Sequence, residues 1–179
     1  ESRKDMTSRG FTHESTYNES KEWYTPPTLF EQLGIEFDLD PCAPAEGELR
    51  TVPAKRFITL EQNGLLSPWG EKENVFMNPP YGADTPKWLN KLAEHSQNGG
   101  SGMALVFSRT DTIWFHDIAK HIDAIAFFKG RIQFLKPDGT RGKGSGAGSM
   151  LAISGQDNRE QVEYAFNKHN LGIVASYWT

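Results

Sequence analysis

Asn78-Pro79-Pro80-Tyr81 places an amide, a carbonyl on a rigid backbone and an aromatic ring at one point of the chain. The two prolines restrict the backbone torsions, and Pro80 has no N–H group that could bond locally to the Pro79 carbonyl oxygen. The Asn78 side chain and the Pro79 carbonyl can therefore present two acceptors to one amino group, while the Tyr81 ring stacks on the molecule that carries it, a contact worth about 1–3 kcal/mol per base. The motif predicts a clamp for a planar, amine-bearing ring such as adenine. The alternative is a strand-end turn whose tyrosine packs into the core.

The segments around this motif predict the elements that must hold it. Val75-Phe76-Met77 is a short apolar run that predicts a buried strand, and Asp84 can cap the helix that follows the motif. Residues 103–107 and 122–128 predict two more buried strands, with a helix over 112–121 between them. This alternation is typical of a parallel sheet with helical crossovers, in which ligands bind at the carboxyl ends of the strands. We therefore expect the motif at the functional edge of the sheet.

The rest of the chain predicts elements that flank this pattern. Residues 1–22 are polar and without periodicity, and predict a flexible N-terminal arm, which leaves residues 23–179 as a single domain. The prolines after Asp40 are expected to end the first strand at that residue. The other expected elements are a helix capped by Thr28 that reaches Leu33, strands over 35–40 and 57–59, a hairpin that pairs 131–135 with 149–154, a helix near 158–168 and a strand near Ile173.

Length and composition limit the class of protein. At about 150 residues per domain, 179 residues predict one compact domain. No run of about 18 apolar residues could span a bilayer and the start lacks a signal-peptide pattern, so we expect a cytoplasmic protein with no membrane contact. A single cysteine, Cys42, excludes an intramolecular disulfide and a multi-thiolate zinc site, and we expect no metal. The net charge of −4 argues against a general polyanion-binding surface, so any nucleic-acid contact must be local.

The chain from Trp23 to about Ser154 resembles the phage-type DNA adenine N6-methyltransferase (Dam) family. The Asn-Pro-Pro-Tyr motif alone is shared with methyltransferases that act on rRNA and protein amides, whereas an ordered combination of segments is more specific. These segments are Trp23-Tyr24-Thr25-Pro26, Phe37-Asp38-Leu39-Asp40-Pro41-Cys42-Ala43, Trp69 followed by Val75 to Gly82, and Arg109-Thr110-Asp111-Thr112 with Trp114-Phe115. The resemblance implies an α/β, Rossmann-like class I methyltransferase fold with a mostly parallel central sheet and an antiparallel C-terminal hairpin. It also implies S-adenosylmethionine as the methyl donor and double-stranded DNA as the substrate.

The resemblance also implies which residues bind the cofactor. Asp40 lies where the glycine-rich cofactor loop of Rossmann-like methyltransferases follows the first strand, and its carboxylate could hold the methionine ammonium. Pro41-Cys42-Ala43 replaces the expected Gly-x-Gly, and Cys42 by itself is read as a small buried hydrophobe. Trp23 and Thr25-Pro26 match the segment that touches the carboxylate end of the cofactor, although a plain helix cap would explain Thr25 equally well. Asn63 falls where the family often has an acid near the cofactor adenine.

The expected DNA contacts lie in the C-terminal half of the chain. Residues 129–143 contain five basic residues and one acid, a net charge of +4 within an acidic chain. Such asymmetry is typical of a local phosphate-binding patch, although a solvated hairpin tip would have the same composition. The expected DNA-binding residues are Arg109, Arg131, Lys136, Arg141 and Lys143.

The expected reaction is direct methyl transfer to the N6 amine of an adenine flipped out of the duplex, for which the family resemblance suggests a GATC-like site. The catalytic group comprises Asn78, Pro79, Pro80 and Tyr81, whereas Trp88 and Trp114 recur at helical spacing and are read as core. Two alternatives remain open at this point: an RNA or protein-amide N-methyltransferase, which would use the same clamp, and an inert nucleic-acid-binding module. A zinc deaminase is excluded because one cysteine cannot supply its Cys-x-x-Cys ligands.

Overall fold

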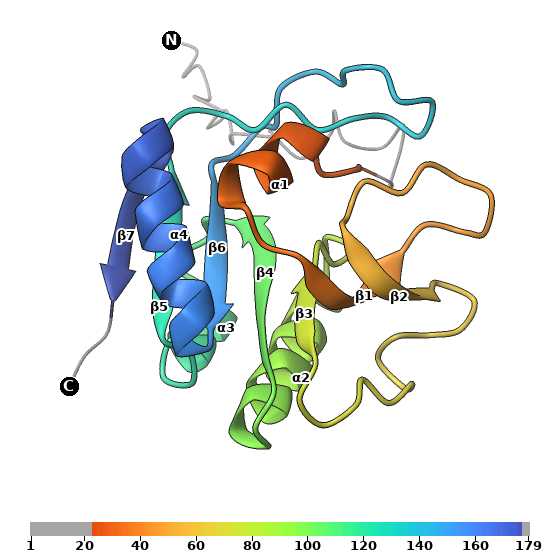
Figure 1. The fold of residues 1–179 in the computed structure, drawn as a ribbon, viewed down its shortest axis with the longest axis horizontal. Coiled ribbons are helices and arrows are strands. Elements are labelled where there is room, and N and C mark those ends of the chain that lie inside the picture. Colours follow the sequence, from red (N-terminus) through yellow and green to blue (C-terminus); the bar gives the residue numbers. More distant parts are fainter. Residues whose placement is uncertain (1–22, 177–179) are drawn as a thin grey trace, which may run out of the picture.

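A seven-stranded sheet with helices on both faces forms the body of the protein, as seen in the computed structural model, which describes residues 23–176 (Figure 1). The strands are β1 (Phe37–Ala43), β2 (Ala54–Thr59), β3 (Asn74–Met77), β4 (Ser101–Phe107), β5 (Ala124–Phe128), β6 (Ser149–Ser154) and β7 (Gly172–Ser176). The helices are α1 (Pro27–Leu33), α2 (Thr85–Gln97), α3 (Ile113–Ile118) and α4 (Gln156–His169). The arm expected over residues 1–22 lies outside the described residues.

The order of strands confirms the expected fold class. The sheet runs β2-β1-β3-β4-β6-β5-β7, and the neighbours from β2 to β4 are parallel. The strand β6 is antiparallel to β4 and β5, and β7 is antiparallel to β5. The carboxyl ends of β1 to β5 therefore point to one edge of the sheet. This is a mixed α/β sheet with a parallel N-terminal part and antiparallel C-terminal strands, consistent with the class I methyltransferase fold.

The C-terminal strands pair differently from the expected hairpin. Residues 131–135 form no strand, and Leu135 makes only isolated bridges to Tyr24 and Arg141. The partner expected for them, β6, instead lies between β4 and β5. All six residues of β6 are buried, which suits a central strand covered on both faces and not a strand of a surface hairpin.

Two boundaries at the start of the domain also differ from expectation. The strand β1 continues through Pro41 to Ala43, because its register with β2 shifts between Asp40 and Ala43 and this bulge tolerates a proline that lacks a ladder donor. The helix α1 begins at Pro27, with Pro26 in the cap position and Thr28 inside the helix. Proline at the first helical position has the required φ and needs no donor. No side-chain cap is present, because the side chain of Pro26 has no acceptor atom.

Two apolar clusters, one on each face of the sheet, fix the layers. The first joins α2 and α3 to the sheet and includes Trp88 and Leu92. The second joins α1 and α4 to the other face, which Figure 1 shows in front, and is built around the edge-to-face rings of Phe30 and Phe76 with centroids 4.8 Å apart. Each fully buried large side chain contributes about 1.5–3 kcal/mol, so these clusters supply most of the force that holds the strands in register.

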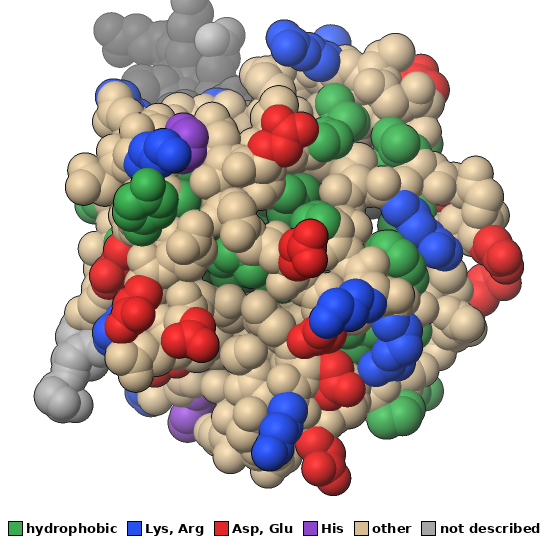
Figure 2. All heavy atoms as spheres, in the orientation of Figure 1, with side chains coloured by type: hydrophobic (Ala, Val, Ile, Leu, Met, Phe, Trp, Pro, Cys, Tyr) green, Lys and Arg blue, Asp and Glu red, His purple; other side chains and the backbone are tan. Residues whose placement is uncertain are grey.

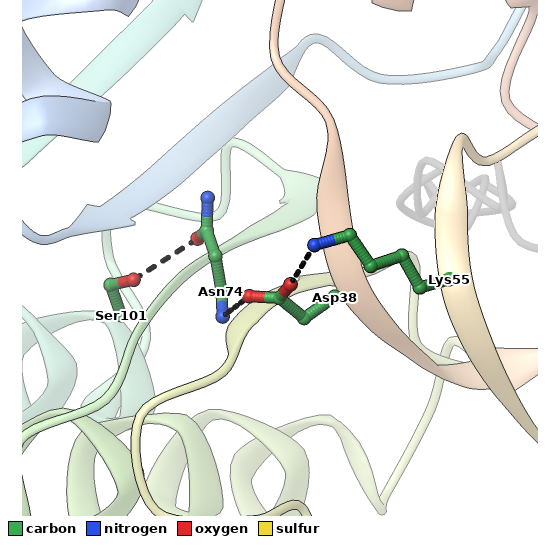
Figure 3. Close-up of polar contacts among 4 residues, drawn as sticks. All are labelled: Asp38, Lys55, Asn74 and Ser101. Atoms are coloured by element: carbon green, nitrogen blue, oxygen red, sulfur yellow. Dashed lines mark hydrogen bonds and ion pairs between the residues drawn. The ribbon is translucent and has the colours of Figure 1, made fainter.

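Polar side chains tie the amino ends of four strands together (Figure 3). Asp38 of β1 accepts hydrogen bonds from the Asn74 backbone N–H at 2.8 Å and from Lys55 Nζ at 3.0 Å, and Ser101 Oγ donates to Asn74 Oδ1 at 3.2 Å. The Asn74 hydrogen bond and then Lys55 lower the pKa of Asp38. Asp38 therefore belongs to the edge opposite the Asn78 motif, and its role is structural.

Candidate active site

The Asn78 carboxamide is held in one orientation directly after β3. Its Nδ2 donates to the Trp23 carbonyl oxygen at 3.1 Å and to Thr25 Oγ1 at 3.3 Å, while its Oδ1 accepts from the Tyr81 hydroxyl at 3.3 Å. Both amide protons therefore face the segment that leads into α1, and the amide oxygen faces the tyrosine of its own motif. The amide oxygen has two lone pairs, so it can accept from an amino group in addition to Tyr81.

The two prolines of the motif shape the loop between β3 and α2. Pro79 is buried, and no donor in the described part of the chain reaches its carbonyl oxygen, which leaves this oxygen available as an acceptor. The Pro80 carbonyl accepts from Thr85 Oγ1 at 3.4 Å in the first turn of α2. Asp84 holds the cap position of α2, but its carboxylate pairs with Lys87 at 2.9 Å and makes no capping hydrogen bond.

The Tyr81 ring stacks on Phe107, which ends β4. The ring centroids are 4.2 Å apart and the planes differ by 13°, which is a face-to-face stack. One face of Tyr81 is therefore covered by a neighbouring ring. A base that stacks on Tyr81 must use the opposite face or displace Phe107.

A cavity of about 530 Å³ opens beside this motif at the carboxyl ends of β1 and β3. Its volume lies within the range of small-molecule sites, about 300–1,000 Å³. All four residues of the motif line it, together with seven of the expected cofactor residues: Trp23, Thr25, Asp40, Pro41, Cys42, Ala43 and Asn63. Pro26 does not line the cavity, because it turns the chain into α1 as the cap residue.

Asp40 is the buried carboxylate of this cavity. It is 3% exposed, and its Oδ1 accepts the Cys42 backbone N–H at 2.9 Å. Burial raises the pKa of Asp40 to about 7, against the smaller lowering effects of the Cys42 hydrogen bond and of Arg50. A cation beside it would favour the ionised form, so the site fits a ligand with an ammonium group. Burial also raises the pKa of the Cys42 thiol, which agrees with its reading as an inert small residue.

The loop after β2 closes the other side of the cavity. Asn63 adopts a left-handed backbone conformation with φ of 55°, and its Oδ1 accepts the Leu65 backbone N–H at 3.2 Å. A Cβ atom on Gly64 would overlap the Pro41 carbonyl, so only glycine permits this close approach of the loop to β1. The loop thereby packs against the bulged end of β1, and residues of both line the cavity.

Several residues of the site were not identified from the sequence. Trp88, read as core, is 5% exposed in the core and also lines the cavity. Lys91, one turn further along α2, donates from Nζ to the carbonyl oxygens of Gly64 at 3.0 Å, Leu65 at 2.8 Å and Ser67 at 2.6 Å. Burial lowers the pKa of Lys91. Other residues that line the cavity and were not expected are Tyr24, Pro44, Thr51, Val52, Leu60, Gly64, Leu65 and Asp84.

The basic segment lies at the same edge of the sheet as the motif. Residues 129–148 connect the carboxyl end of β5 to β6 and cross above α1 in Figure 1, and Lys and Arg side chains project at this upper rim in Figure 2. Lys129, Arg131, Lys136, Arg141 and Lys143 are all exposed, and so is Arg109 after β4. Tyr24 and Leu135 exchange two backbone hydrogen bonds of 2.9 and 2.8 Å, which join this segment to the residues that contact Asn78.

Over residues 23–176, no three His, Cys, Asp or Glu residues cluster as they would around a metal ion. Within the same residues, no helix combines the length and the apolar composition needed to cross a bilayer.

Comparison with known proteins identifies the family. The family model for DNA N-6-adenine-methyltransferase (Dam) matches residues 13–173. A DNA N-6-adenine-methyltransferase of Haemophilus phage HP1 is 29% identical over 130 residues, which cover 69% of this chain and 72% of that protein. A DNA N-6-adenine-methyltransferase of Escherichia phage T1 is 24% identical over 182 aligned positions, covering 89% of this chain and 74% of that protein. No solved structure matches the chain significantly. Because the family model spans most of the sequence, the resemblance is confirmed, and the chain belongs to the Dam family of DNA N6-adenine methyltransferases.

Proposed function

We propose that this chain methylates the N6 amine of an adenine extruded from double-stranded DNA, with S-adenosylmethionine bound in the cavity beside Asn78. The observation that carries the proposal is that Asn78, with its motif, and the buried Asp40 line the same cavity of about 530 Å³. An acceptor for an amine and a carboxylate for an ammonium group are the two polar features that such a reaction needs.

The clamp formed by Asn78 and Pro79 prepares the amine for attack. The lone pair of adenine N6 is delocalised into the ring, so the amine is a poor nucleophile. Hydrogen bonds from its two protons to Asn78 Oδ1 and to the Pro79 carbonyl favour a pyramidal nitrogen whose lone pair points into the cavity. Good orientation of two reactants can lower a barrier by about 7–11 kcal/mol, which makes positioning the main catalytic effect of these residues.

The transfer then needs no covalent enzyme intermediate. When bound, S-adenosylmethionine supplies a methyl group on a positively charged sulfur. The N6–carbon bond would form as the carbon–sulfur bond breaks, which would leave the sulfur neutral, so the site would need no anion-stabilising group. Asn78 cannot accept the N6 proton because an amide is not a base at neutral pH, and the proton leaves to water.

The residues around the cavity fit the two ends of this methyl donor. Asp40 would hold the ammonium group, next to Trp23 and Thr25 and the small Cys42 and Ala43. The turn at Asn63 and the ring of Trp88 would flank the adenine end. In place of the glycine-rich loop, the bulge at Pro41 brings the end of β1 to the cavity wall.

DNA would lie across the edge that carries the basic segment. Arg109, Arg131, Lys136, Arg141 and Lys143 are exposed there and can neutralise phosphates. Flipping a base costs a few kcal/mol, which stacking on Tyr81 would offset in part. The proposal extends to a GATC-like site, which the family resemblance suggests, and to action on DNA in the cytoplasm of a bacterial host, which the two phage relatives support.

Incubation with tritiated S-adenosylmethionine and, in parallel, DNA, RNA and protein tests the proposal. Label on adenine N6 of DNA is expected, and its loss in Asn78→Ala with unchanged cofactor affinity would support the clamp. Label only on RNA or on a protein amide would overturn the choice of substrate. Absence of both cofactor binding and label would favour an inert nucleic-acid-binding module.

A further inference from the structure

We infer that Thr25 is a positioning residue for catalysis, whose hydroxyl anchors the Asn78 amide in the orientation that the Trp23 carbonyl selects, and that this contact, and not one to the cofactor, is its main role. The inference rests on the proposed function, because it assigns Thr25 to the same clamp. It begins from the two hydrogen bonds that Asn78 Nδ2 donates, to the Trp23 carbonyl and to Thr25 Oγ1.

The orientation of the amide matters because its two ends have opposite hydrogen-bonding roles. With Oδ1 toward the amine, Asn78 accepts an N6 proton, whereas after a half-turn about its last torsion it would offer two protons to a group that is itself a donor. The two orientations have nearly the same shape, so packing cannot distinguish them. Only its hydrogen-bond partners can: the hydroxyls of Tyr81 and Thr25 can each donate or accept and so suit either orientation, whereas the Trp23 carbonyl can only accept.

The Trp23 carbonyl selects the orientation of the amide, and Thr25 anchors the amide in that orientation. The Trp23 carbonyl oxygen is 3.1 Å from Nδ2 and can only accept, so a flipped amide would place two oxygens against each other. Thr25 Oγ1 takes the other proton at 3.3 Å, and Thr25 is 2% exposed, so water does not compete freely for this bond. The Asn78 Nδ2 group is thereby held by two acceptors of the segment that leads into α1, which leaves Oδ1 as the end of the amide that can accept from a substrate.

The segment that carries Trp23 and Thr25 is itself held in place by hydrogen bonds and by packing. Tyr24, between Trp23 and Thr25, exchanges backbone hydrogen bonds of 2.9 and 2.8 Å with Leu135, and its hydroxyl donates to Glu48 Oε2 at 2.9 Å. Thr25 leads directly into Pro26 and α1, whose residues Leu29 and Leu33 are buried. The acceptors that face Asn78 therefore belong to a short segment fixed at both ends.

The test is Thr25→Val, which keeps the shape of the side chain and removes its acceptor. We expect the turnover number on DNA to fall about three- to tenfold, the equivalent of one hydrogen bond, with S-adenosylmethionine affinity unchanged within twofold. Thr25→Ser, which restores the hydroxyl, should recover most of the turnover. Thr28→Val, an exposed threonine one turn away in α1, is the matched control and should behave as the wild type.

Other results of the Thr25→Val experiment would contradict the inference. If Thr25→Val weakens cofactor affinity and leaves the turnover at saturating cofactor unchanged, the inference is overturned, because Thr25 would then be a cofactor contact. Unchanged cofactor affinity together with unchanged turnover would also overturn it. If Thr25→Val does not fold, Thr25→Ala must show the same fall in turnover at unchanged affinity. Assaying the wild-type protein in parallel distinguishes failure of the proposed function from failure of this inference. No methylation of DNA by the wild type refutes the proposed function, whereas an active wild type with an equally active Thr25→Val variant refutes only the inference about Thr25.

Discussion

Replacing Asp40 by Asn should stabilise the cofactor-free protein at pH 8 while it weakens cofactor binding. The carboxyl of Asp40 is 3% exposed, and burial raises its pKa from 3.8 to about 7. A shift of about three pKa units corresponds to about 4 kcal/mol, which is the cost of keeping this buried group ionised in the folded state above pH 7. Asparagine has a similar shape and carries no charge, so the variant avoids that cost.

The pH dependence follows from the direction of the shift. The folded protein holds the Asp40 proton more tightly than the unfolded chain does, since the folded pKa is the higher one. The stability that this group contributes is therefore fully present below about pH 4, is lost as the pH rises to about 7 and stays absent above. Urea unfolding at pH 5 and pH 8 should accordingly show a gain for Asp40→Asn that is larger at pH 8.

Cofactor affinity should change in the opposite sense. Wild-type affinity for S-adenosylmethionine should increase as the pH rises through about 7, because the ionised carboxylate is the form that binds an ammonium group. Truncating one partner of a buried charge pair costs at least about 2 kcal/mol, so Asp40→Asn should bind at least about thirtyfold more weakly and without this pH dependence. Titration calorimetry with S-adenosylhomocysteine, which retains the ammonium group, measures the effect at both pH values.

Asp38→Asn is the matched control, two residues earlier in the same strand. The pKa of Asp38 is lowered by hydrogen bonds from Asn74 and Lys55, so its stabilising contribution is present at neutral pH and is lost on acidification. This variant should be destabilised at pH 8 with unchanged cofactor affinity. Equal cofactor affinity of wild type and Asp40→Asn, or no larger gain in stability at pH 8 than at pH 5, would refute the reasoning.

Three further substitutions test other parts of the site. Tyr81→Phe keeps the stacking ring and should retain most of the turnover, whereas Tyr81→Ala should reduce it greatly with cofactor affinity spared; equal rates would contradict the stacking role. Lys91→Met removes three hydrogen bonds to the loop that follows Asn63, so the free energy of unfolding measured in urea should fall by about 1–3 kcal/mol. Calorimetry should also show a weaker cofactor affinity, and an unchanged affinity would mean that this loop does not contact the cofactor. Neutralising Arg141 and Lys143 together should flatten the slope of log affinity for DNA against log salt by about two units if each meets a phosphate, while Lys120→Gln on the far edge should leave the slope unchanged.

The central strands of the sheet were predictable from the sequence, because continuous apolar runs indicate strands that are buried on both faces. The runs before Asn78 and over 103–107 are apolar on both faces, and such runs predict central strands without knowledge of their partners. The motif itself was predictable because prolines fix its local geometry. Local rules failed at Pro41, where a shift in register between two strands allows a proline inside the ladder.

Contacts between distant segments could not be predicted. The pairing of β6 with β4 and β5, in place of residues 131–135, depends on which strands bury it and has no local signal. The contacts of Lys91 with three carbonyls depend on the path of a loop more than twenty residues away in the chain. Conversely, the expected cofactor residues other than Pro26 do meet at one cavity, because the carboxyl ends of parallel strands share an edge.

The bridge between Tyr24 and Leu135 joins residues more than a hundred positions apart in the chain. Contacts of such long range form late in folding, because a large loop must close before they are rewarded. A chain still emerging from the ribosome, or one cut short before Leu135, lacks this bridge to the carbonyl that faces Asn78. A chain that ends before Leu135 should therefore hold the Trp23 carbonyl less firmly against Asn78 than the full domain does.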